Sequence, residues 1–372
     1  MTGTVGATVG VEEEYHLVDA TTGGLADAPA VVATAKGLLG DDAQSEISTS
    51  QLEVATPVCT SLADVRRQLV RLRRGAAQAA EAHGCRVLAC GTHPSGSWLE
   101  QRLTEGERYL EVYERLGLLA LQQLIAGCHV HVGMSSSGEP DAELGVRVLD
   151  RLRPDLHLLL ALSGSSPFWE GVDTSYASYR TQWFNRFPVT GTAQLVGDRA
   201  TYDRLVADLV ATGMVRDASH LYWDARLSTR FPTVEVRIAD TCPVVDDVVL
   251  QAALVRSLVR VAADEAVRDV PFARPRSELV RAARWRAARF GVTGQLVDLR
   301  AGGLAEGAAL LDAALIRLRP DLEELGDWDE VRELADALLA RGTSAQRQRD
   351  VFVRTGELSE VVQAVVRESA AA

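Results

Sequence analysis

Strand-like segments with polar residues at alternate positions constrain the fold of this chain most. Residues two apart in a β-strand point to the same face, about 6.5–7 Å from each other. Three segments, Val9–Asp19, Gly127–Gly133 and Thr233–Ala239, carry such pairs, and valine or isoleucine often occupies the positions between. The pairs are Glu12 with Glu14, His129 with His131, and Glu235 with Arg237. We therefore expect a sheet with one apolar face and one face of carboxylates, imidazoles and arginine.

A fourth segment, Ser45–Pro57, adds two more acids to this set. Glu46 and Glu53 are seven residues apart, so an unbroken strand would place them on opposite faces. Both can point inward only if the chain bends between them. The sequence Ser48-Thr49-Ser50 is the expected place for that bend.

The order of the expected elements indicates an α+β fold. Helices are predicted over 61–81, capped by Ser61, and over 107–124 and 141–163, and a short strand over 85–90. Strands precede residue 240, and the chain beyond Asp246 is almost wholly helical. With no linker or repeat in between, we expect one catalytic domain over 1–372, strand-rich in 1–245 and mainly helical in 246–372. The irregular, aromatic-rich segment 164–191 is expected to face the substrate.

Composition excludes several classes of partner. The net charge of −12 argues against non-specific binding to nucleic acid or to an anionic membrane. No stretch approaches eighteen uninterrupted apolar residues, and the first ten residues have no basic side chain. The five cysteines are scattered, which is typical of reduced, buried thiols. We expect a cytoplasmic protein that acts on small molecules. Whether it forms a homodimer is left open by the sequence.

The chemistry of the polar face points to divalent cations and phosphate. Carboxylates so close together are unstable without cations, and oxygen-rich sites with one imidazole prefer Mg²⁺ or Mn²⁺ over Zn²⁺. Two or three such ions beside an arginine suit phosphoryl transfer. Lysine occurs once, at Lys36, and no G-x-x-x-x-G-K-[ST] or G-x-G-x-x-G motif is present. ATP would therefore be held through metal ions and arginines.

Two other functions can be weighed from the same residues. His-x-His on a strand also opens the metal sites of amidohydrolases, which makes a metal-dependent amide hydrolase the alternative. That chemistry needs further histidines on later strands, and only His157 and His220 follow, outside strand-like segments. A non-catalytic binding protein with this fold would be indicated by loss of Glu14, Glu53 or Arg237, and all three are present.

Four motifs in chain order resemble those of the bacterial carboxylate–amine ligases of the YbdK type, the second class of glutamate–cysteine ligases. They are VGVEEEYHLVD, GCHVHVG, SSPFWEGVDTSYASYRTQWFNRFP and FPTVEVRIADTC, and the C-terminal helical region is also similar. The resemblance covers residues 9–365 and implies a curved, mainly antiparallel sheet like that of the glutamine synthetase catalytic domain, with helices on its outer face. It also implies a reaction in which ATP phosphorylates a carboxylate, typically the γ-carboxyl of glutamate, and an amine displaces phosphate. Weak glutamate–cysteine ligase activity is what the family label usually covers.

The resemblance also implies roles for individual residues. The implied metal ligands are Glu12, Glu14, Glu46, Glu53, His129 or His131, and Glu235. Arg237 corresponds to a phosphate-stabilising arginine, while Arg180, Asn185 and Arg186 correspond to positions that contact substrate or phosphate. The amine acceptor, the number of metal ions and the true acid are left open.

Overall fold

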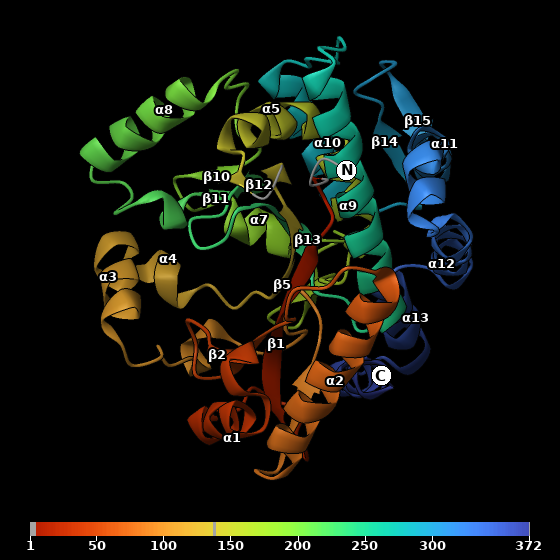
Figure 1. The fold of residues 1–372 in the computed structure, drawn as a ribbon. Coiled ribbons are helices and arrows are strands. Elements are labelled where there is room, and N and C mark those ends of the chain that lie inside the picture. Colours follow the sequence, from red (N-terminus) through yellow and green to blue (C-terminus); the bar gives the residue numbers. More distant parts are fainter. Residues whose placement is uncertain (1–4, 137–138, 372) are drawn as a thin grey trace.

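The computed structural model describes residues 5–136 and 139–371, and its central element is an antiparallel sheet. Among the described residues this sheet has seven strands in the order β12-β13-β5-β1-β3-β2, with β4 also paired to β1 (Figure 1). The strands are β1 (Val9–Asp19), β2 (Ala43–Ser45), β3 (Gln51–Ala55), β4 (Cys85–Leu88), β5 (Gly127–Gly133), β12 (Ala225–Leu227) and β13 (Thr233–Asp240). Every pairing within it is antiparallel, as predicted.

The register of the sheet aligns the polar pairs across strands. Glu12 lies opposite His129, Glu14 opposite Glu53, and Glu235 opposite His131. Directly opposed residues point to the same face. The carboxylates and imidazoles of four strands, which are far apart in sequence, therefore meet on one face.

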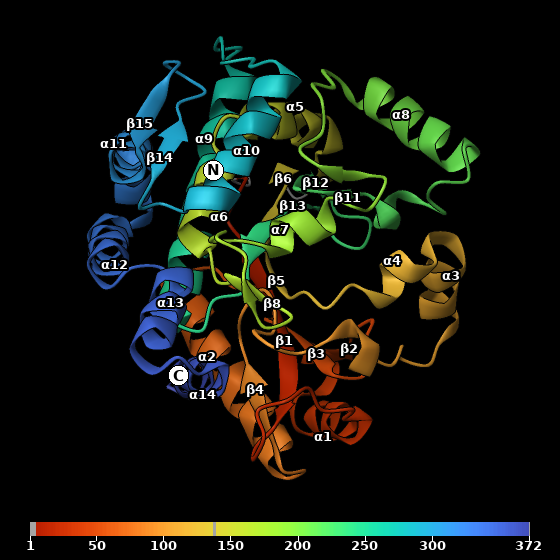
Figure 2. The same cartoon turned by 180° about the vertical axis from the view of Figure 1, so that it is seen from behind.

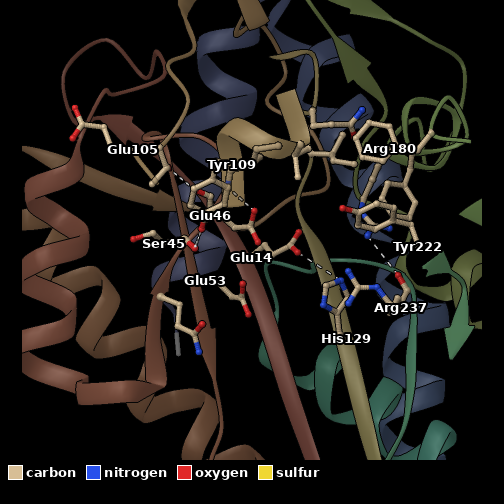
Figure 3. A pocket seen from close by; sticks show the side chains of 18 of the residues that line it. Glu14, Ser45, Glu46, Glu53, Glu105, Tyr109, His129, Arg180, Tyr222 and Arg237 are labelled. Carbon is tan, nitrogen blue, oxygen red and sulfur yellow. Dashed lines mark hydrogen bonds and ion pairs between the residues drawn. The ribbon is translucent and has the colours of Figure 1, made fainter. Parts of the chain in front are cut away.

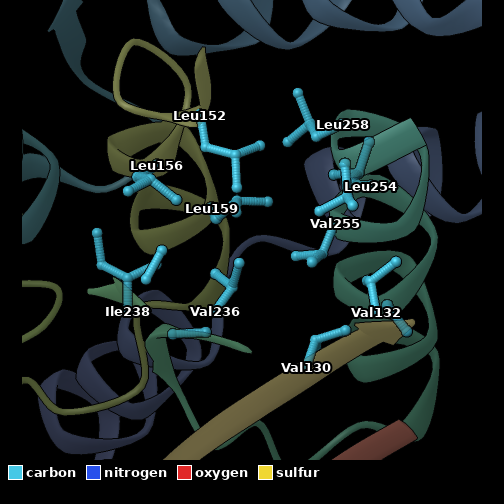
Figure 4. Close-up of a cluster of buried hydrophobic side chains, with 14 of the residues drawn as sticks. Val130, Val132, Leu152, Leu156, Leu159, Val236, Ile238, Leu254, Val255 and Leu258 are labelled. Carbon is cyan, nitrogen blue, oxygen red and sulfur yellow. The ribbon is translucent and has the colours of Figure 1, made fainter. Parts of the chain in front are cut away.

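The apolar face of the sheet packs against four helices. These are α2 (Leu62–Glu81), α5 (Ala142–Leu152), α6 (Leu156–Ser163) and α9 (Val245–Val267). Figure 4 shows valines and isoleucine of β5 and β13 facing leucines of α5, α6 and α9, and all of these side chains belong to the largest buried cluster. Ser61 caps α2 as expected, because its side chain accepts a hydrogen bond of 3.1 Å from the Asp64 amide. The predicted α+β class is thus confirmed.

The C-terminal part is mainly helical, with one interruption that the sequence did not predict. After α10 (Ser277–Phe290) comes a small hairpin of β14 (Gln295–Val297) and β15 (Leu304–Glu306). It is followed by α11 (Gly307–Leu325), α12 (Trp328–Arg341), α13 (Ser344–Thr355) and α14 (Leu358–Ala370), which lie together at one side of the molecule (Figures 1 and 2). No helix among the described residues is both long and apolar enough to cross a membrane.

Two predicted helices are each divided in the structure. The stretch 107–124 contains α3 (Glu107–Leu116) and α4 (Leu118–Leu121), because Gly117 adopts φ 56° and ends the first helix. The stretch 141–163 breaks between α5 and α6 around Pro154, which lacks the amide that a continuous helix needs. The remaining helices are α1 (Pro29–Leu39), α7 (Arg180–Phe184) and α8 (Arg199–Ala211).

The irregular segment 164–191 crosses the end of the sheet. It holds the short strands β8 (Phe168–Trp169), β9 (Val172–Asp173) and β10 (Thr190–Gly191), and the helix α7. Its anchor is the buried carboxylate of Asp240 at the end of β13, which accepts hydrogen bonds from Ser166 Oγ (2.6 Å) and Ser178 Oγ (2.7 Å). These bonds bring both halves of the segment to the sheet and position α7 beside it.

Candidate active site

One group of site residues surrounds Glu12. Its two carboxylate oxygens lie 3.2 Å from His131 Nε2 and 3.2 Å from His129 Nδ1. Glu12, His131 and Glu235 each offer a ligand atom, and these atoms lie within 4.8 Å of one another. The other ring nitrogen of His131 is 2.9 Å from Thr233 Oγ1, which orients the ring. Two carboxylates and an imidazole at this spacing can hold a divalent cation.

A second group gathers three carboxylates next to the first. The chain bends between β2 and β3, as the positions of Glu46 and Glu53 required, and both side chains line the same cavity as Glu14. Burial, and then the charge of Glu46, raises the pKa of Glu14 to about 7. Burial, and then the charges of Glu46, Glu12 and Glu14, raises the pKa of Glu53 well above its usual value. This mutual repulsion is what a bound cation would relieve.

Two arginines hold Glu235, and the sequence predicted only one of them. Arg226 of β12 lies opposite Glu235 and contacts it through Nε (2.9 Å) and Nη2 (3.2 Å), while Arg237 Nη1 contacts the same carboxylate. Burial alone would raise the pKa of Glu235, but Arg237 and Arg226 outweigh it and hold that pKa well below the usual range. Arg226 was missed because β12 has only three residues, too few for a visible alternation.

Two arginines near the carboxylates each have a buried Nε donor that no protein group satisfies. Among the described residues, Nε of Arg180 and Nε of Arg237 have no hydrogen-bond partner. Arg180 is 3% exposed, and its closest carboxylate contact is Asp240 at 3.9 Å. Buried donors left without a partner are costly, so these two side chains are suited to bind an anion.

The polar face opens into a cleft with two lobes. The first lobe has a volume of about 370 Å³ and the second about 660 Å³. Both are lined by five predicted site residues, here called the shared floor: Glu14, Glu46, Glu53, His129 and Arg237 (Figure 3). The first lobe also holds Arg180 and Lys36, while the second holds Glu12, His131, Arg226 and Glu235.

Two predicted residues lie outside this cleft. Asn185 and Arg186 are exposed and do not line either lobe. The Asn185 side-chain oxygen accepts a hydrogen bond from Arg284, and Arg186 stacks over the Trp183 ring and donates to Gln122 Oε1 at 2.6 Å. Their contacts are with neighbouring protein groups. Of the three predicted polar side chains in segment 180–186, only Arg180 lines the cleft.

A family model supplies the decisive comparison. The model of glutamate–cysteine ligase family 2 matches residues 8–364. This chain belongs to that family. A protein of Frankia alni named "Putative glutamate--cysteine ligase 2-2" is 43% identical over 97% of both chains, and a Salinispora tropica protein named "Putative glutamate--cysteine ligase 2" is 41% identical over 94% of this chain and 91% of its own.

Solved structures with low sequence identity share the fold of this family member. The glutamate–cysteine ligase of Francisella tularensis in complex with AMP superposes with a TM-score of 0.72 at 13% identity, covering 99% of this chain and 90% of that one. A bifunctional glutathione synthetase from Pasteurella multocida gives 0.70 at 17% identity, covering 98% of this chain and 51% of that one. The resemblance stated from the motifs is therefore confirmed, and with it the class of ATP-dependent carboxylate–amine ligases.

The amide hydrolase alternative finds no support in the geometry. His157 is buried within α6, and His220 lies in a short 3-10 turn, Ala218–His220. Among the described residues neither belongs to the cluster of potential metal ligands around Glu12.

Proposed function

We propose that this protein uses ATP to phosphorylate a carboxylate, the γ-carboxyl of glutamate, and then joins the acyl group to an amine. One observation carries the proposal. The shared floor, with its crowded carboxylates and the unsatisfied Nε donor of Arg237, lies between two lobes, and Arg180 with a second such donor lines the first lobe. One lobe can bind ATP and the other can bind the acid, so that the transferred phosphoryl group lies over the shared floor between them.

The larger, second lobe is suited to the nucleotide. Its lining includes the exposed Arg216 and Arg230, together with hydroxyls that can bind phosphate. It adjoins an apolar slot of about 220 Å³ that is lined by valines, by Pro232 and by Phe231. Phe231 is 51% exposed and lies edge-on to the His131 ring at 5.9 Å. An adenine ring in this slot would cover Phe231 and direct the triphosphate toward the shared floor.

The site also fits Mg²⁺ or Mn²⁺. Hard oxygen donors dominate, with one imidazole within reach, and a cation would offset the burial and the charge of Glu46 that together raise the pKa of Glu14. The residues that would hold metal ions are Glu12, Glu14, Glu46, Glu53, His129 or His131, and Glu235. When bound, such ions neutralise phosphate charge and align the triphosphate with the acid.

The residues of this chain would then act as follows. Arg237 and Arg180 donate hydrogen bonds to the phosphoryl oxygens and stabilise charge that develops during transfer. A carboxylate oxygen of the acid attacks the γ-phosphorus, and ADP leaves. The amine nitrogen next attacks the acyl carbon, phosphate leaves with the electron pair of the broken C–O bond, and the amine loses a proton. Segment 164–191, held by Asp240, contributes Arg180, Phe184 and Phe187 to the lining of the first lobe, and there it would limit access of water to the acyl phosphate.

Trapping with hydroxylamine tests this proposal without knowledge of the amine. The protein is incubated with ATP, Mg²⁺, hydroxylamine and a panel of acids, and acyl hydroxamate is measured together with ADP. We expect hydroxamate with glutamate, in equal amount to ADP, and none after chelation of the metal. Hydroxamate with no acid, or amide hydrolysis without ATP, would contradict the proposal, and the latter would favour the hydrolase.

Substitutions of the acids test where the reaction takes place. Glu14→Gln, Glu53→Gln and Glu235→Gln keep the side-chain shape but remove a charge that balances a cation. We expect hydroxamate formation to fall by about a hundredfold or more in each. Glu81→Gln at the exposed end of α2 is the matched control and should retain full activity. Near-normal activity of Glu235→Gln would remove that residue from the site.

We further propose that the strand-rich and helical portions act as one cytoplasmic catalytic domain. The largest buried cluster supports this, because it contains residues of both portions. The five cysteines are buried and free, in keeping with a reducing compartment. Analytical ultracentrifugation would distinguish a monomer from the homodimer that the sequence leaves open.

A further inference from the structure

The first lobe has one wall made of apolar side chains from separate elements. The wall consists of Val112 of α3, Ile125 before β5, Phe184 of α7, Phe187, and Tyr222 of β11 (Tyr222–Trp223). Its three aromatic rings pack on one another, with centroid distances of 5.3 to 6.0 Å. We call these five residues the apolar wall.

The apolar wall adjoins the reacting groups and extends away from them. The Arg180 guanidinium carbon lies 5.5 Å from the centre of the Phe184 ring, and Tyr222 lines both lobes beside Arg237 (Figure 3). Behind Val112 and Tyr222 lies a further apolar hollow of about 20 Å³. A ligand group that extends from the acyl carbon along this wall therefore meets mostly carbon surface.

Apart from Ile47, the rest of the first lobe is lined by residues with polar groups. Its lining includes Lys36, Ser45, Glu46, Thr104 and Glu105. In Figure 3, Ser45 and Glu46 lie next to each other, across the cavity from Tyr222 and Arg180, and Glu105 lies on the same side but farther out. An amino acid such as glutamate, with its ammonium and second carboxylate, finds complementary charges on this polar side. The apolar wall is then left for the other substrate of the lobe.

We propose that the amine substrate is a primary amine with an apolar chain, bound along the apolar wall, and that cysteine is not preferred. This inference rests on the proposed function. An apolar wall favours ligands that bury more carbon surface, and each additional methylene group raises kcat/KM about fourfold. Cysteine offers one methylene and a thiol, and it also carries a carboxylate that would have to lie near carbon surface. A longer alkyl or aromatic chain would fill the wall.

Linear alkylamines provide a direct test, because their nitrogen atoms have nearly the same basicity and differ only in chain length. The assay measures ADP release and amide product with ATP, Mg²⁺ and glutamate, across methylamine, ethylamine, propylamine, butylamine and cysteine. We expect kcat/KM to rise about fourfold per methylene, and butylamine to exceed cysteine by at least tenfold. A flat series, or cysteine as the best substrate, would overturn the inference.

Substitutions locate the effect on the wall. Val112→Thr keeps the shape of the side chain but places a hydroxyl in the lobe, so the ratio of butylamine to methylamine rates should fall severalfold. Val267→Thr, at an exposed position near the end of α9, is the matched control and should leave the ratio unchanged. An unchanged ratio in Val112→Thr would also overturn the inference. Hydroxamate formation distinguishes failure of the proposed function from failure of this inference. If no hydroxamate forms, the proposed function is refuted. If hydroxamate forms but cysteine is the preferred amine, only the preference for an apolar amine is refuted.

Discussion

Removing the buried ion pair behind the site should cost much of the stability of this protein. Glu13 lies between two predicted metal ligands on β1, but its side chain points to the opposite face and is fully buried. There it binds Arg73 of α2, with Nη2 at 2.5 Å and Nε at 3.1 Å, and accepts a hydrogen bond of 2.7 Å from the Tyr15 hydroxyl. Arg73 also donates to the backbone carbonyls of Cys242 (2.6 Å) and Pro243. The pair thus joins β1, α2 and the turn that precedes α9.

The loss in unfolding free energy depends on which buried polar groups each substitution leaves without a partner. Arg73→Met leaves a buried carboxylate with one hydroxyl partner and two carbonyls that lose their donor, which costs about 3–5 kcal/mol. Glu13→Gln leaves a buried guanidinium without its counter-ion and should cost a similar amount. In the double variant neither charge is left alone, so its cost should fall short of the sum by at least about 2 kcal/mol.

Urea unfolding followed by tryptophan fluorescence measures these differences. The matched control is Arg67→Met on the same helix, because Arg67 forms a surface pair with Asp64 and its side chain is 65% exposed. That control should leave the unfolding midpoint unchanged. The reasoning would be refuted if Arg73→Met lowered the free energy of unfolding by less than about 1 kcal/mol, or if the two single losses added up fully in the double variant.

Three further predictions concern the site and its surroundings. Arg237→Lys keeps the charge but loses the planar guanidinium, so kcat for hydroxamate formation should fall about a hundredfold while the KM for ATP changes no more than a few-fold. If only the KM for the acid changed, Arg237 would bind the carboxylate of the substrate instead of stabilising the transferred phosphoryl group. Gly127→Ala would place a Cβ in steric conflict with the Arg180 guanidinium, so activity should fall at least about tenfold with normal circular dichroism. The control Gly37→Ala meets no atom within 4 Å and should be fully active. Burial lowers the pKa of His93 to about 4, below its unfolded value near 6.5, so this histidine destabilises the fold as pH falls. Its share of the loss in unfolding free energy between pH 7 and 5 should be about 2 kcal/mol, so His93→Asn should lose about that much less than the unchanged protein in urea unfolding at the two pH values.

Some features that differ from expectation could have been read from the sequence. Gly117 and Pro154 divide the two predicted helices, and both are residues that commonly end helices. Arg226 could not have been found in this way, because a strand of three residues shows no periodicity. The contacts of Asn185 and Arg186 depend on Arg284 and Gln122, which are distant in the chain. Local pattern carries no information about such contacts.

The sequence by itself determined the local elements and which side chains share a face. Period-two alternation paired Glu12 with Glu14 and Glu235 with Arg237, because backbone geometry alone sets that period. Only the tertiary structure decided which of these pairs lie opposite one another in the sheet and that two arginines bind Glu235. It also decided that Glu13, which lies between Glu12 and Glu14, forms a buried ion pair on the opposite face. Strand register depends on packing between segments more than a hundred residues apart, and the apolar wall likewise draws its residues from four separate segments. Local propensity specifies the parts, and long-range burial places them relative to one another.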